Sequence, residues 1–597
     1  MPHAGIFKKG GESQRSAKLL AIKVVHNKGG FMKKIFLKPV LFAFAAGLLL
    51  PLSAKASEED IQKKLDALTK EVIDLKGQVK RVDDKSIGKW LTIGGNYRFR
   101  VDSLYGKTSG YTSAPAFMGA VQTDPGTAGF FNTDGAKALL SAKSYSALQT
   151  MAPGLNPAMM QGMLAQYLMG SQGMTAEQAN TYLQNLGGKA YVPGYKPKNE
   201  TLYTNQFGID LTAKATQNII VHAKLNMYKA FGSQSDSTVT GDYFSDRVGV
   251  FDGTLSHVPS NSLLNVDRAY ATWSNILDQP VWFSVGRRPS TNGDPSNLRT
   301  NNERPGNGGT PALLVDYAFD GMTLGYAPDI DMLPGAYMKV CYGRGFDSGI
   351  KTFSANSVKD TDMLGVAILP VDTEPLRIWL QWNRGFNIFD FPVMNNTKAF
   401  GSTAPSVNLG SIDWFGGGAT STIKKAGIGD LNLFGDFAVS ITHPNDKVSA
   451  NAGFQGLGTG SFMQPGAPKD HTGWAAYLGV RYDLPSRTKL GFEFNHGSKN
   501  WITFAPAADD LWTSKVGTRG NVYEPYIIQE LNLKPISSYL SKAFFRLGYQ
   551  YYDFKYTGSN NWVGAPQKIS SIKATDMQLL APMKEAHDVY ATFEVHF

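Results

Sequence analysis

The sequence predicts an all-β fold, a transmembrane antiparallel β-barrel of about 16 strands. Three observations predict it. Segments of about ten residues alternate apolar and polar side chains, long and short connections alternate strictly, and an apolar alternation reaches the last residue. The composition agrees, because 63 glycines, 12% aromatic residues and 18% charged residues suit strands and turns better than helices.

The net charge of the chain comes from its first 56 residues. The formal charge is +10, but this segment alone holds ten Lys or Arg and one acid, Glu12. The remaining residues hold 49 basic and 48 acidic side chains, which excludes a basic footprint for nucleic acid. The single cysteine, Cys341, excludes a disulfide framework and a cysteine-based zinc or haem-attachment site.

Residues 32–56 have the anatomy of a secretory signal peptide. Lys33 and Lys34 precede the apolar run 40–52, and Ala54 and Ala56 form an Ala-x-Ala cleavage site. The run is too short for a good membrane helix. We therefore expect cleavage after Ala56 and export from the cytoplasm. Residues 1–31 show no structural pattern, and we interpret them as a mis-assigned upstream start, with Met32 as the true start.

Residues 57–86 predict a short periplasmic helix. Its apolar residues are spaced alternately by four and three, the a and d pattern of a coiled coil. They are Ile61, Leu65, Leu68, Val72, Leu75, Val79 and Val82. Two interpretations stay open: the helix docks on its own protein, or residues 61–82 form a homo-oligomer. Three heptads are marginal alone, so an oligomer would need further contacts.

Period-2 alternation begins near residue 90 and continues through residues 90–597. In 91–102, Tyr97, Phe99 and Val101 alternate with polar residues, and the pattern returns at 206–228, 376–383, 474–495 and 543–551. A soluble sandwich gives similar alternation. The connection lengths favour a membrane barrel, which has short periplasmic turns and long external loops.

The connections sort into two classes. Short ones lie at 216–218, 275–280, 328–335, 371–375, 424–427, 484–487 and 534–541. Long ones lie at 106–200, 230–262, 289–311, 345–360, 385–409, 442–472, 497–521 and 556–585. This order requires residues 312–327 to form one strand, although Asp320 and Gly321 suit a hairpin turn. The segment 410–423 is the weakest strand, and 18 strands is the alternative count.

The C-terminus carries a candidate assembly signal. An apolar alternation runs up to the terminal phenylalanine, as in outer-membrane barrels, through Val589, Ala591, Phe593, Val595 and Phe597. The candidate signal consists of the last three, Phe593, Val595 and Phe597. We therefore expect the outer membrane of a Gram-negative cell as the location. The expected partners are outer-membrane lipid and the barrel assembly machinery.

Several segments resemble a known family. The signal peptide, the heptad segment and the stretches 93–102, 490–501 and 589–597 resemble an uncharacterised family of outer-membrane porin-like proteins of anaerobic metal-reducing and related bacteria. Residues 266–273 and 283–288 also resemble a general porin hairpin. The resemblance implies a porin-like channel and implies no chemistry.

A 16-stranded barrel leaves an aqueous channel, and the alternation assigns charged side chains to its wall. The pore-lining candidates are Arg98, Arg100, Asp210, Lys214, Lys224, Arg377, Arg481, Asp483, Lys489, Glu493 and Arg546. One interpretation is an ordinary solvated wall, and the sharper one is a pore that favours anions. The loop after Arg288, with Arg299 and Arg304, is a candidate constriction loop.

The first long loop, 106–200, is unusually poor in charge and is expected to be partly helical. Asn156 before Pro157 begins one helix, and Thr175 with Gln178 forms the capping box of another. Two such helices would form a lid over the barrel or a plug inside it. The methionines of the loop suit packing better than copper binding, because no histidine lies among them.

The sequence favours an outer-membrane porin for small hydrophilic, anion-leaning solutes. The first alternative is a sheath around a multihaem cytochrome partner, whose haems would be entirely the partner's. The second is an outer-membrane enzyme. No catalytic motif, metal site or cofactor site is recognised, so we expect no enzyme activity. Solute specificity, oligomeric state and gating by the first loop stay open.

Overall fold

The computed structural model describes residues 65, 68–72, 76, 90–232, 259, 262–290, 295–302, 313–352, 358–397, 401–505, 510–532 and 542–597. The chain divides into two units, Pro2–Lys89 and Trp90–Phe597. In the first unit every described residue is helical, and the heptad residues Leu65, Leu68 and Val72 are nearly half exposed. The predicted signal peptide and the rest of the predicted helix lie outside the described residues.

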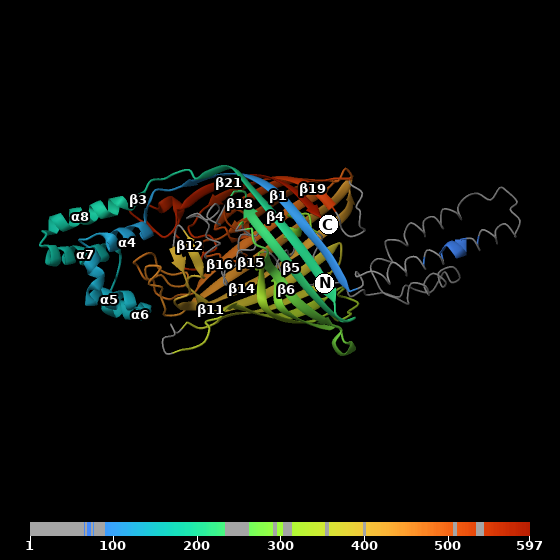
Figure 1. The fold of residues 1–597 in the computed structure, drawn as a ribbon, viewed down its shortest axis with the longest axis horizontal. Helices are drawn as coiled ribbons and strands as arrows, with labels where there is room; N and C mark the ends of the chain where they lie inside the picture. The colour runs from blue at the N-terminus through green and yellow to red at the C-terminus, as the bar shows by residue number, and fades with distance from the viewer. Residues whose placement is uncertain are drawn as a thin grey trace. The chain divides into compact units, whose positions relative to one another are not determined.

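Sixteen strands close into one antiparallel barrel (Figure 1). They are β1 (Leu91–Thr108), β4 (Lys198–Lys214), β5 (Ile219–Ala230), β6 (Asn265–Ser274), β7 (Val281–Ser290), β8 (Tyr317–Tyr326), β9 (Tyr337–Phe346), β10 (Thr361–Asp372), β11 (Leu376–Phe389), β14 (Asn408–Ala426), β15 (Gly429–Pro444), β16 (His471–Asp483), β17 (Thr488–Gly497), β18 (Gly520–Glu530), β19 (Lys542–Phe554) and β21 (Met583–His596). The predicted fold class and strand number are confirmed. β8 is one strand through Asp320 and Gly321, and β14, the weakest strand in the sequence, is 19 residues long.

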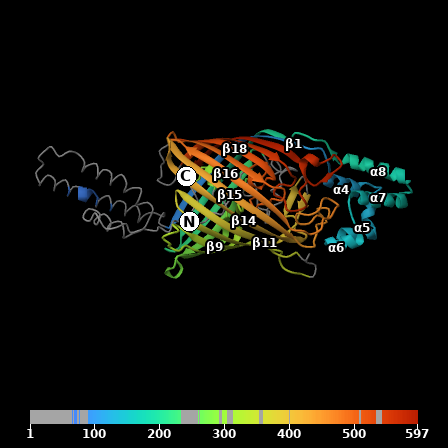
Figure 2. The same ribbon diagram turned by 180° about the vertical axis from the view of Figure 1, so that it is seen from behind.

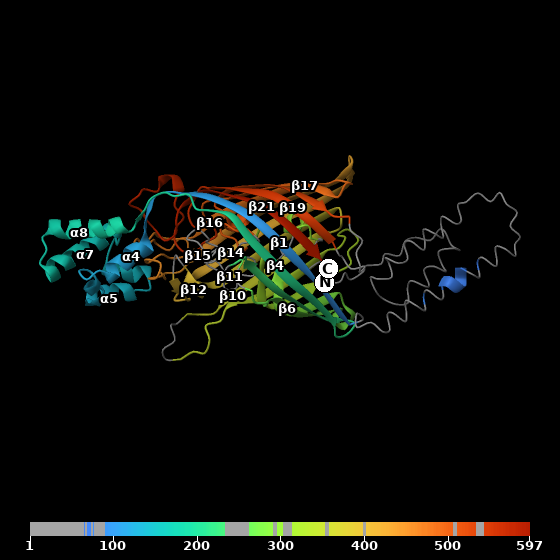
Figure 3. The same cartoon turned by 45° about the horizontal axis from the view of Figure 1, so that its top comes forward.

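The strands lie oblique to the barrel axis (Figure 3) and separate two environments. In β19, the outward Phe545 and Leu547 are exposed, whereas Arg546 and Gln550, on the lumen side, are buried. A strand with lipid on one face and the lumen on the other requires this period of two. None of the helices among the described residues is long and apolar enough to cross a membrane.

The first and last strands form the seam that closes the barrel. β1 pairs with β21 from Asn96 opposite His596 to Lys107 opposite Glu585. The terminal Phe597 exchanges backbone hydrogen bonds of 2.8 and 3.0 Å with Gly95. A Cβ atom on Gly95 would lie 2.8 Å from the Phe597 ring and 2.5 Å from the carbonyl oxygen of Gly208. Gly95 therefore allows the C-terminal ring to lie against the first strand.

We expect Gly95→Ala to weaken this seam. Its methyl group would force the backbone or the Phe597 ring to shift, at a cost of about 1–3 kcal/mol, the range for overpacking. The measurement is the fraction of refolded protein that keeps folded mobility on cold SDS gels, as a function of temperature. Gly119→Ala in a helix is the matched control, because a Cβ there meets no atom within 4 Å. Equal melting of the two variants would contradict the proposed packing.

The first long loop forms a helical insert between β2 (Tyr111–Ser113) and β3 (Tyr191–Val192). β2 pairs with β3 on one side and with β20 (Met577–Gln578) on the other. Its helices are α4 (Ala114–Thr123), α5 (Asp134–Ser141), α6 (Tyr145–Met151), α7 (Pro157–Gln172) and α8 (Ala176–Lys189). α7 and α8 begin at the predicted caps, Asn156 and Thr175. The sequence predicted two helices. The other three, α4, α5 and α6, were not predicted, because these short helices carry no long apolar period.

The insert packs on the connection between β15 and β16. Its buried residues share an apolar cluster with Val448, Phe454, Phe462 and Met463 of that connection. It lies beyond the end of the barrel where the long connections gather (Figures 1 and 2). This position is that of a lid rather than of a plug.

Other long connections fill part of the lumen. One apolar cluster joins Trp414 and Tyr477 of the wall to Leu314, Trp501 and Phe504 of two connections. The indole Nε1 of Trp414 donates to the carbonyl oxygen of Ile502 at 2.8 Å. A further pair of short strands, β12 (Met394–Thr397) and β13 (Gly401–Thr403), lies in the connection between β11 and β14. The part of the chain that the structure describes therefore gives the barrel a packed interior.

Candidate functional site

The helix α9 (Ser296–Arg299) enters the lumen from the connection between β7 and β8. The backbone carbonyl of Leu298 accepts a hydrogen bond from Arg481 Nη1 at 2.7 Å, and that of Arg299 accepts one from Arg546 Nη1 at 2.7 Å. Lys489 Nζ also donates to Asn301 Oδ1 at 2.7 Å. These three donors come from β16, β19 and β17, so the wall holds this segment through two backbone carbonyls and one side chain.

A second segment, residues 510–519, enters the lumen from the connection between β17 and β18. Lys515 Nζ donates to Glu524 Oε2 at 2.6 Å and also pairs with Glu493 Oε2. Lys515 lies in this segment, whereas Glu493 and Glu524 lie in β17 and β18. The cation therefore holds the segment against two neighbouring strands.

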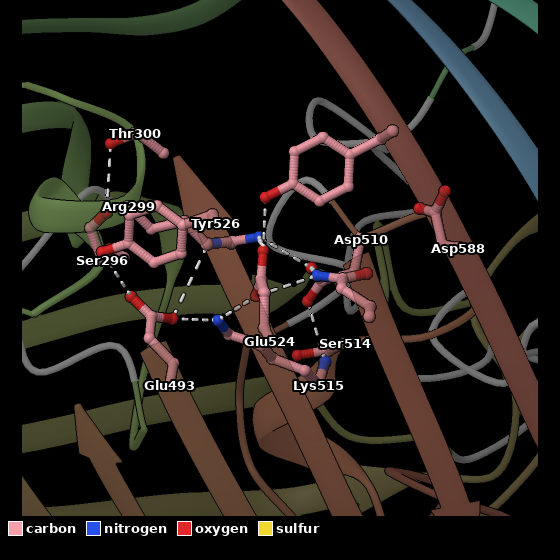
Figure 4. Close-up of polar contacts among 12 residues, drawn as sticks. Ser296, Arg299, Thr300, Glu493, Asp510, Ser514, Lys515, Glu524, Tyr526 and Asp588 are labelled. Atoms are coloured by element: carbon pink, nitrogen blue, oxygen red, sulfur yellow. Dashed lines mark hydrogen bonds and ion pairs between the residues drawn. The ribbon is translucent and has the colours of Figure 1, made fainter. Parts of the chain in front are cut away.

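Arg299 joins the two segments into one cluster (Figure 4). Its Nη1 atom lies 3.0 Å from Asp510 Oδ1 and 3.5 Å from Glu524 Oε1, and its Nε lies 4.0 Å from Glu493 Oε2. We name Arg299, Glu493, Asp510, Lys515 and Glu524 the luminal ion cluster. It contains two cations and three carboxylates, and each side chain is at most 4% exposed.

Neutral donors supply the remaining hydrogen bonds of these carboxylates. Gln550 Nε2 donates to Asp510 Oδ1 at 2.7 Å and to Glu524 Oε2 at 3.1 Å. Tyr590 OH donates to Glu524 Oε1 at 2.6 Å, and Tyr477 OH donates to Glu493 Oε2 at 2.6 Å. Buried charges persist when they are paired and hydrogen-bonded in this way, and removing one partner is strongly destabilising.

The carboxylates also keep Arg299 charged. Burial alone would lower the pKa of this guanidinium, but Glu524, Asp510 and Glu493 together hold its pKa well above the ordinary value. A single arginine thus interacts with one carboxylate of the second segment and two of the wall. Arg299 can therefore hold α9 against residues 510–519 and against the wall.

A second group of buried charges lies between β1 and β21. Arg100 Nε lies 2.6 Å from Asp102 Oδ1, and Arg100 Nη2 lies 2.9 Å from Asp588 Oδ2. Arg546 Nη2 lies 3.1 Å from Glu594 Oε1, while its Nη1 donates to Arg299 as described above. Arg546 therefore connects the barrel seam to α9.

The structure distributes the predicted pore-lining residues over different environments. The buried ones are Arg98, Arg100, Arg377, Arg481, Glu493 and Arg546. The partly exposed ones are Asp210, Lys224, Asp483 and Lys489, and Lys214 is exposed. The side chains of the buried group are not solvated in the described structure. α9 and residues 510–519 contact three of them, Arg481, Arg546 and Glu493.

The structure also shows where most of the predicted constriction-loop and assembly residues lie. Arg288 lies within β7 of the wall, where its Nε donates to Ser284 Oγ at 2.8 Å, and Arg299 lies in the luminal ion cluster. Arg304 lies outside the described residues. Phe593 packs on Phe545 with ring centroids 5.0 Å apart, whereas Val595 and Phe597 lie along the seam with β1.

Four important residues escaped the sequence analysis. Asp510 and Lys515 lie in a connection without periodicity, and no sequence signal separates them from solvated loop residues. Glu524 and Tyr590 lie on the lumen sides of β18 and β21. Tyr590 could have been found, because it alternates with the apolar residues that end at Phe597.

Among the described residues, no group of three or more His, Cys, Asp or Glu side chains is placed to hold a metal ion. The three carboxylates of the luminal ion cluster are instead occupied by Arg299 and Lys515. The arrangement can hold two loop segments in the lumen, and it can release them if a charge is removed.

The fold is similar to those of several solved outer-membrane proteins. They include OprB of Pseudomonas putida, with 11% identity, 88% of this chain and 97% of that chain covered, and a TM-score of 0.39. An anion-selective porin from Comamonas acidovorans shows 10% identity over 85% of this chain and 99% of that chain, with a TM-score of 0.37. OmpT, an outer membrane protein of Vibrio cholerae, shows 10% identity over 85% and 100%, with a TM-score of 0.34.

No curated protein matches the chain. A family model does match, over residues 196–597, which include every barrel strand from β4 to β21. The chain therefore belongs to the family described as "Protein of unknown function (DUF3373)".

Proposed function

We propose that this protein is an outer-membrane channel for small hydrophilic solutes, and that its own loops close it in the state described here. The observation that carries the proposal is the closed 16-stranded barrel with an apolar exterior and a charged interior. Leu324, Leu380 and Leu547 are each more than half exposed on the outer face. Such exposure suits contact with lipid and not with water.

Aromatic side chains support a position in the outer membrane. Trp474 lies against His496, Phe494 against Tyr523, and Tyr523 against Tyr551, with ring centroids 4.8, 5.1 and 6.2 Å apart. They belong to β16–β19, in the half of these strands nearer to the long connections. Membrane barrels carry aromatic girdles of this kind at their interfaces. The restriction to anaerobic metal-reducing and related bacteria stays a prediction, as do the periplasmic helix and its homo-oligomer.

A cavity in the wall supports a preference for anions. It has a volume of about 40 Å³ and is lined by residues of β7, β8, β9, β10 and β11. Arg288 and Lys339, both buried, line it, and none of its described lining residues is acidic. A lumen surface with excess positive charge raises the local concentration of anions.

Neither alternative function is favoured by a specific observation. A sheath for a multihaem cytochrome would need the space that α9 and residues 510–519 occupy. The carboxylates of the luminal ion cluster are paired with cations, so they give no support to an enzyme. We therefore propose a role in transport and no catalytic role.

The test is the reversal potential of the refolded protein in a planar bilayer under a potassium chloride gradient. We expect infrequent openings whose reversal potential has the sign for chloride. A reversal potential with the sign for potassium would contradict the anion preference. Absence of any conductance, both in the natural protein and after the luminal ion cluster is broken, would contradict the channel itself.

A further inference from the structure

A cavity of about 90 Å³ lies among the long connections. Three segments line it: part of the connection 445–470, residues of 510–519, and most of the segment 555–583. The first of these segments also packs on the helical insert. The cavity is therefore at the end of the barrel where the long connections gather, and its lining contains no member of the luminal ion cluster.

Arg519 is the charged residue of this cavity. Its side chain is buried, and its Nε, Nη1 and Nη2 atoms donate to the carbonyl oxygens of Trp501, Thr557 and Asn561 at 2.9, 3.1 and 2.7 Å. A guanidinium carries five N–H groups in a planar fork. Three of them hold the surrounding loops, and the other two are left for a ligand.

The charge of Arg519 has no carboxylate partner among the described residues. The described residues that line the cavity include no aspartate or glutamate. Burial lowers the pKa of Arg519 to about 9, and no neighbouring charge opposes this effect. A buried cation without a counter-charge is costly, and an anion in the cavity would offset that cost.

The other polar groups of the cavity are neutral. Gln455, Thr513 and Gln578 carry hydroxyl or amide hydrogens. Gln578 Nε2 already donates to Gln567 Oε1 at 2.9 Å, so these two amides face each other. One arginine surrounded by neutral donors suits a small oxyanion, because guanidinium binds planar oxygen pairs through two parallel hydrogen bonds.

We propose that this cavity is a binding site for a small oxyanion of the phosphate type, with Arg519 as the central ligand. The site does not require that the protein conduct, so binding can be tested apart from the proposed function. It would place an anion next to the segment that carries Lys515.

The test uses the full-length refolded protein and inorganic phosphate as the probe. Binding is measured by isothermal titration calorimetry, and the unfolding midpoint is followed in phosphate and in chloride at equal ionic strength. We expect saturable binding and a higher midpoint in phosphate, since a ligand of the native state stabilises it. Adventitious binding without saturation would overturn the proposal.

Gln567→Glu is the decisive variant. Its carboxylate keeps the oxygen that accepts from Gln578 but brings a negative charge to the cavity. We expect phosphate binding to weaken about tenfold or more by charge repulsion, and the midpoint in chloride to rise. Gln166→Glu is the matched control, because Gln166 is exposed in α7 and lies outside the cavity lining.

Equal phosphate binding by Gln567→Glu and the natural protein would contradict the site. If Gln567→Glu does not fold, Arg519→Lys gives a second test, because a lysine keeps the charge but not the planar fork. We expect weaker phosphate binding with this variant as well. Undiminished binding there would equally contradict the role of Arg519.

Discussion

Lys515→Met is expected to open the barrel. The substitution leaves Glu493 and Glu524, both buried, without the cation that lies between them. Removing one partner of a buried ion pair costs about 3–5 kcal/mol. Segment 510–519 can avoid this cost by leaving the lumen, which lets water reach both carboxylates. We therefore expect the open probability in single-channel recordings to rise by about two to four powers of ten.

Two variants make this result specific. Lys573→Met removes an exposed lysine of another long connection, and we expect no change in the recordings. Glu493→Gln in the Lys515→Met background removes one uncompensated charge, and it should restore part of the closure. Recordings of Lys515→Met that match those of the natural protein would show that the ion pair does not hold the segment.

Arg299→Ala is expected to release both luminal segments together. Arg299 joins α9 to Asp510 and to the wall carboxylates, so its loss leaves three buried acids with one cation. We expect hydrogen exchange to accelerate in residues 295–302 and 510–519. The factor should be similar to the rise in open probability expected for Lys515→Met. The barrel strands should keep their slow exchange, because their ladder hydrogen bonds are untouched.

Arg344→Ala is the matched control for this experiment. Arg344 also contacts carboxylates, Asp360 and Asp362, each at 2.7 Å, but its side chain is 34% exposed. Solvent screens such a pair, so its removal changes stability by only about 0–1 kcal/mol. Acceleration in residues 295–302 alone, with 510–519 unchanged, would contradict the coupling of the two segments through Arg299.

The barrel could be predicted because each strand has two different environments. Phe545 lies on the outer apolar face and Arg546 lies on the lumen side, and this difference recurs along the strands with a period of two. The apolar alternation that ends at Phe597 was likewise predictable, because the outer face of the last strand must be apolar. The caps Asn156 and Thr175 also act locally, through hydrogen bonds to residues three positions further along the chain.

The luminal ion cluster could not be predicted, because its members meet only in the folded barrel. Arg299 and Asp510 are more than 200 residues apart, and neither lies in a periodic segment. Glu493 has the correct parity for the lumen, but parity alone does not distinguish a solvated wall residue from the partner of a loop lysine. The choice between an open and a filled lumen depends on loop packing, which leaves no regular pattern in the sequence.

Thiol accessibility in the lumen is the measurement that would decide whether the loops close the barrel. Ser514→Cys in a Cys341→Ser background places the thiol beside Lys515, at a position with 0% exposure. In lipid vesicles we expect its reaction with a water-soluble maleimide to be far slower than that of Ser171→Cys, an exposed residue of α7. The reaction should become fast when Lys515→Met is added. Equal rates for Ser514→Cys and Ser171→Cys without that change would show that residues 510–519 do not fill the lumen.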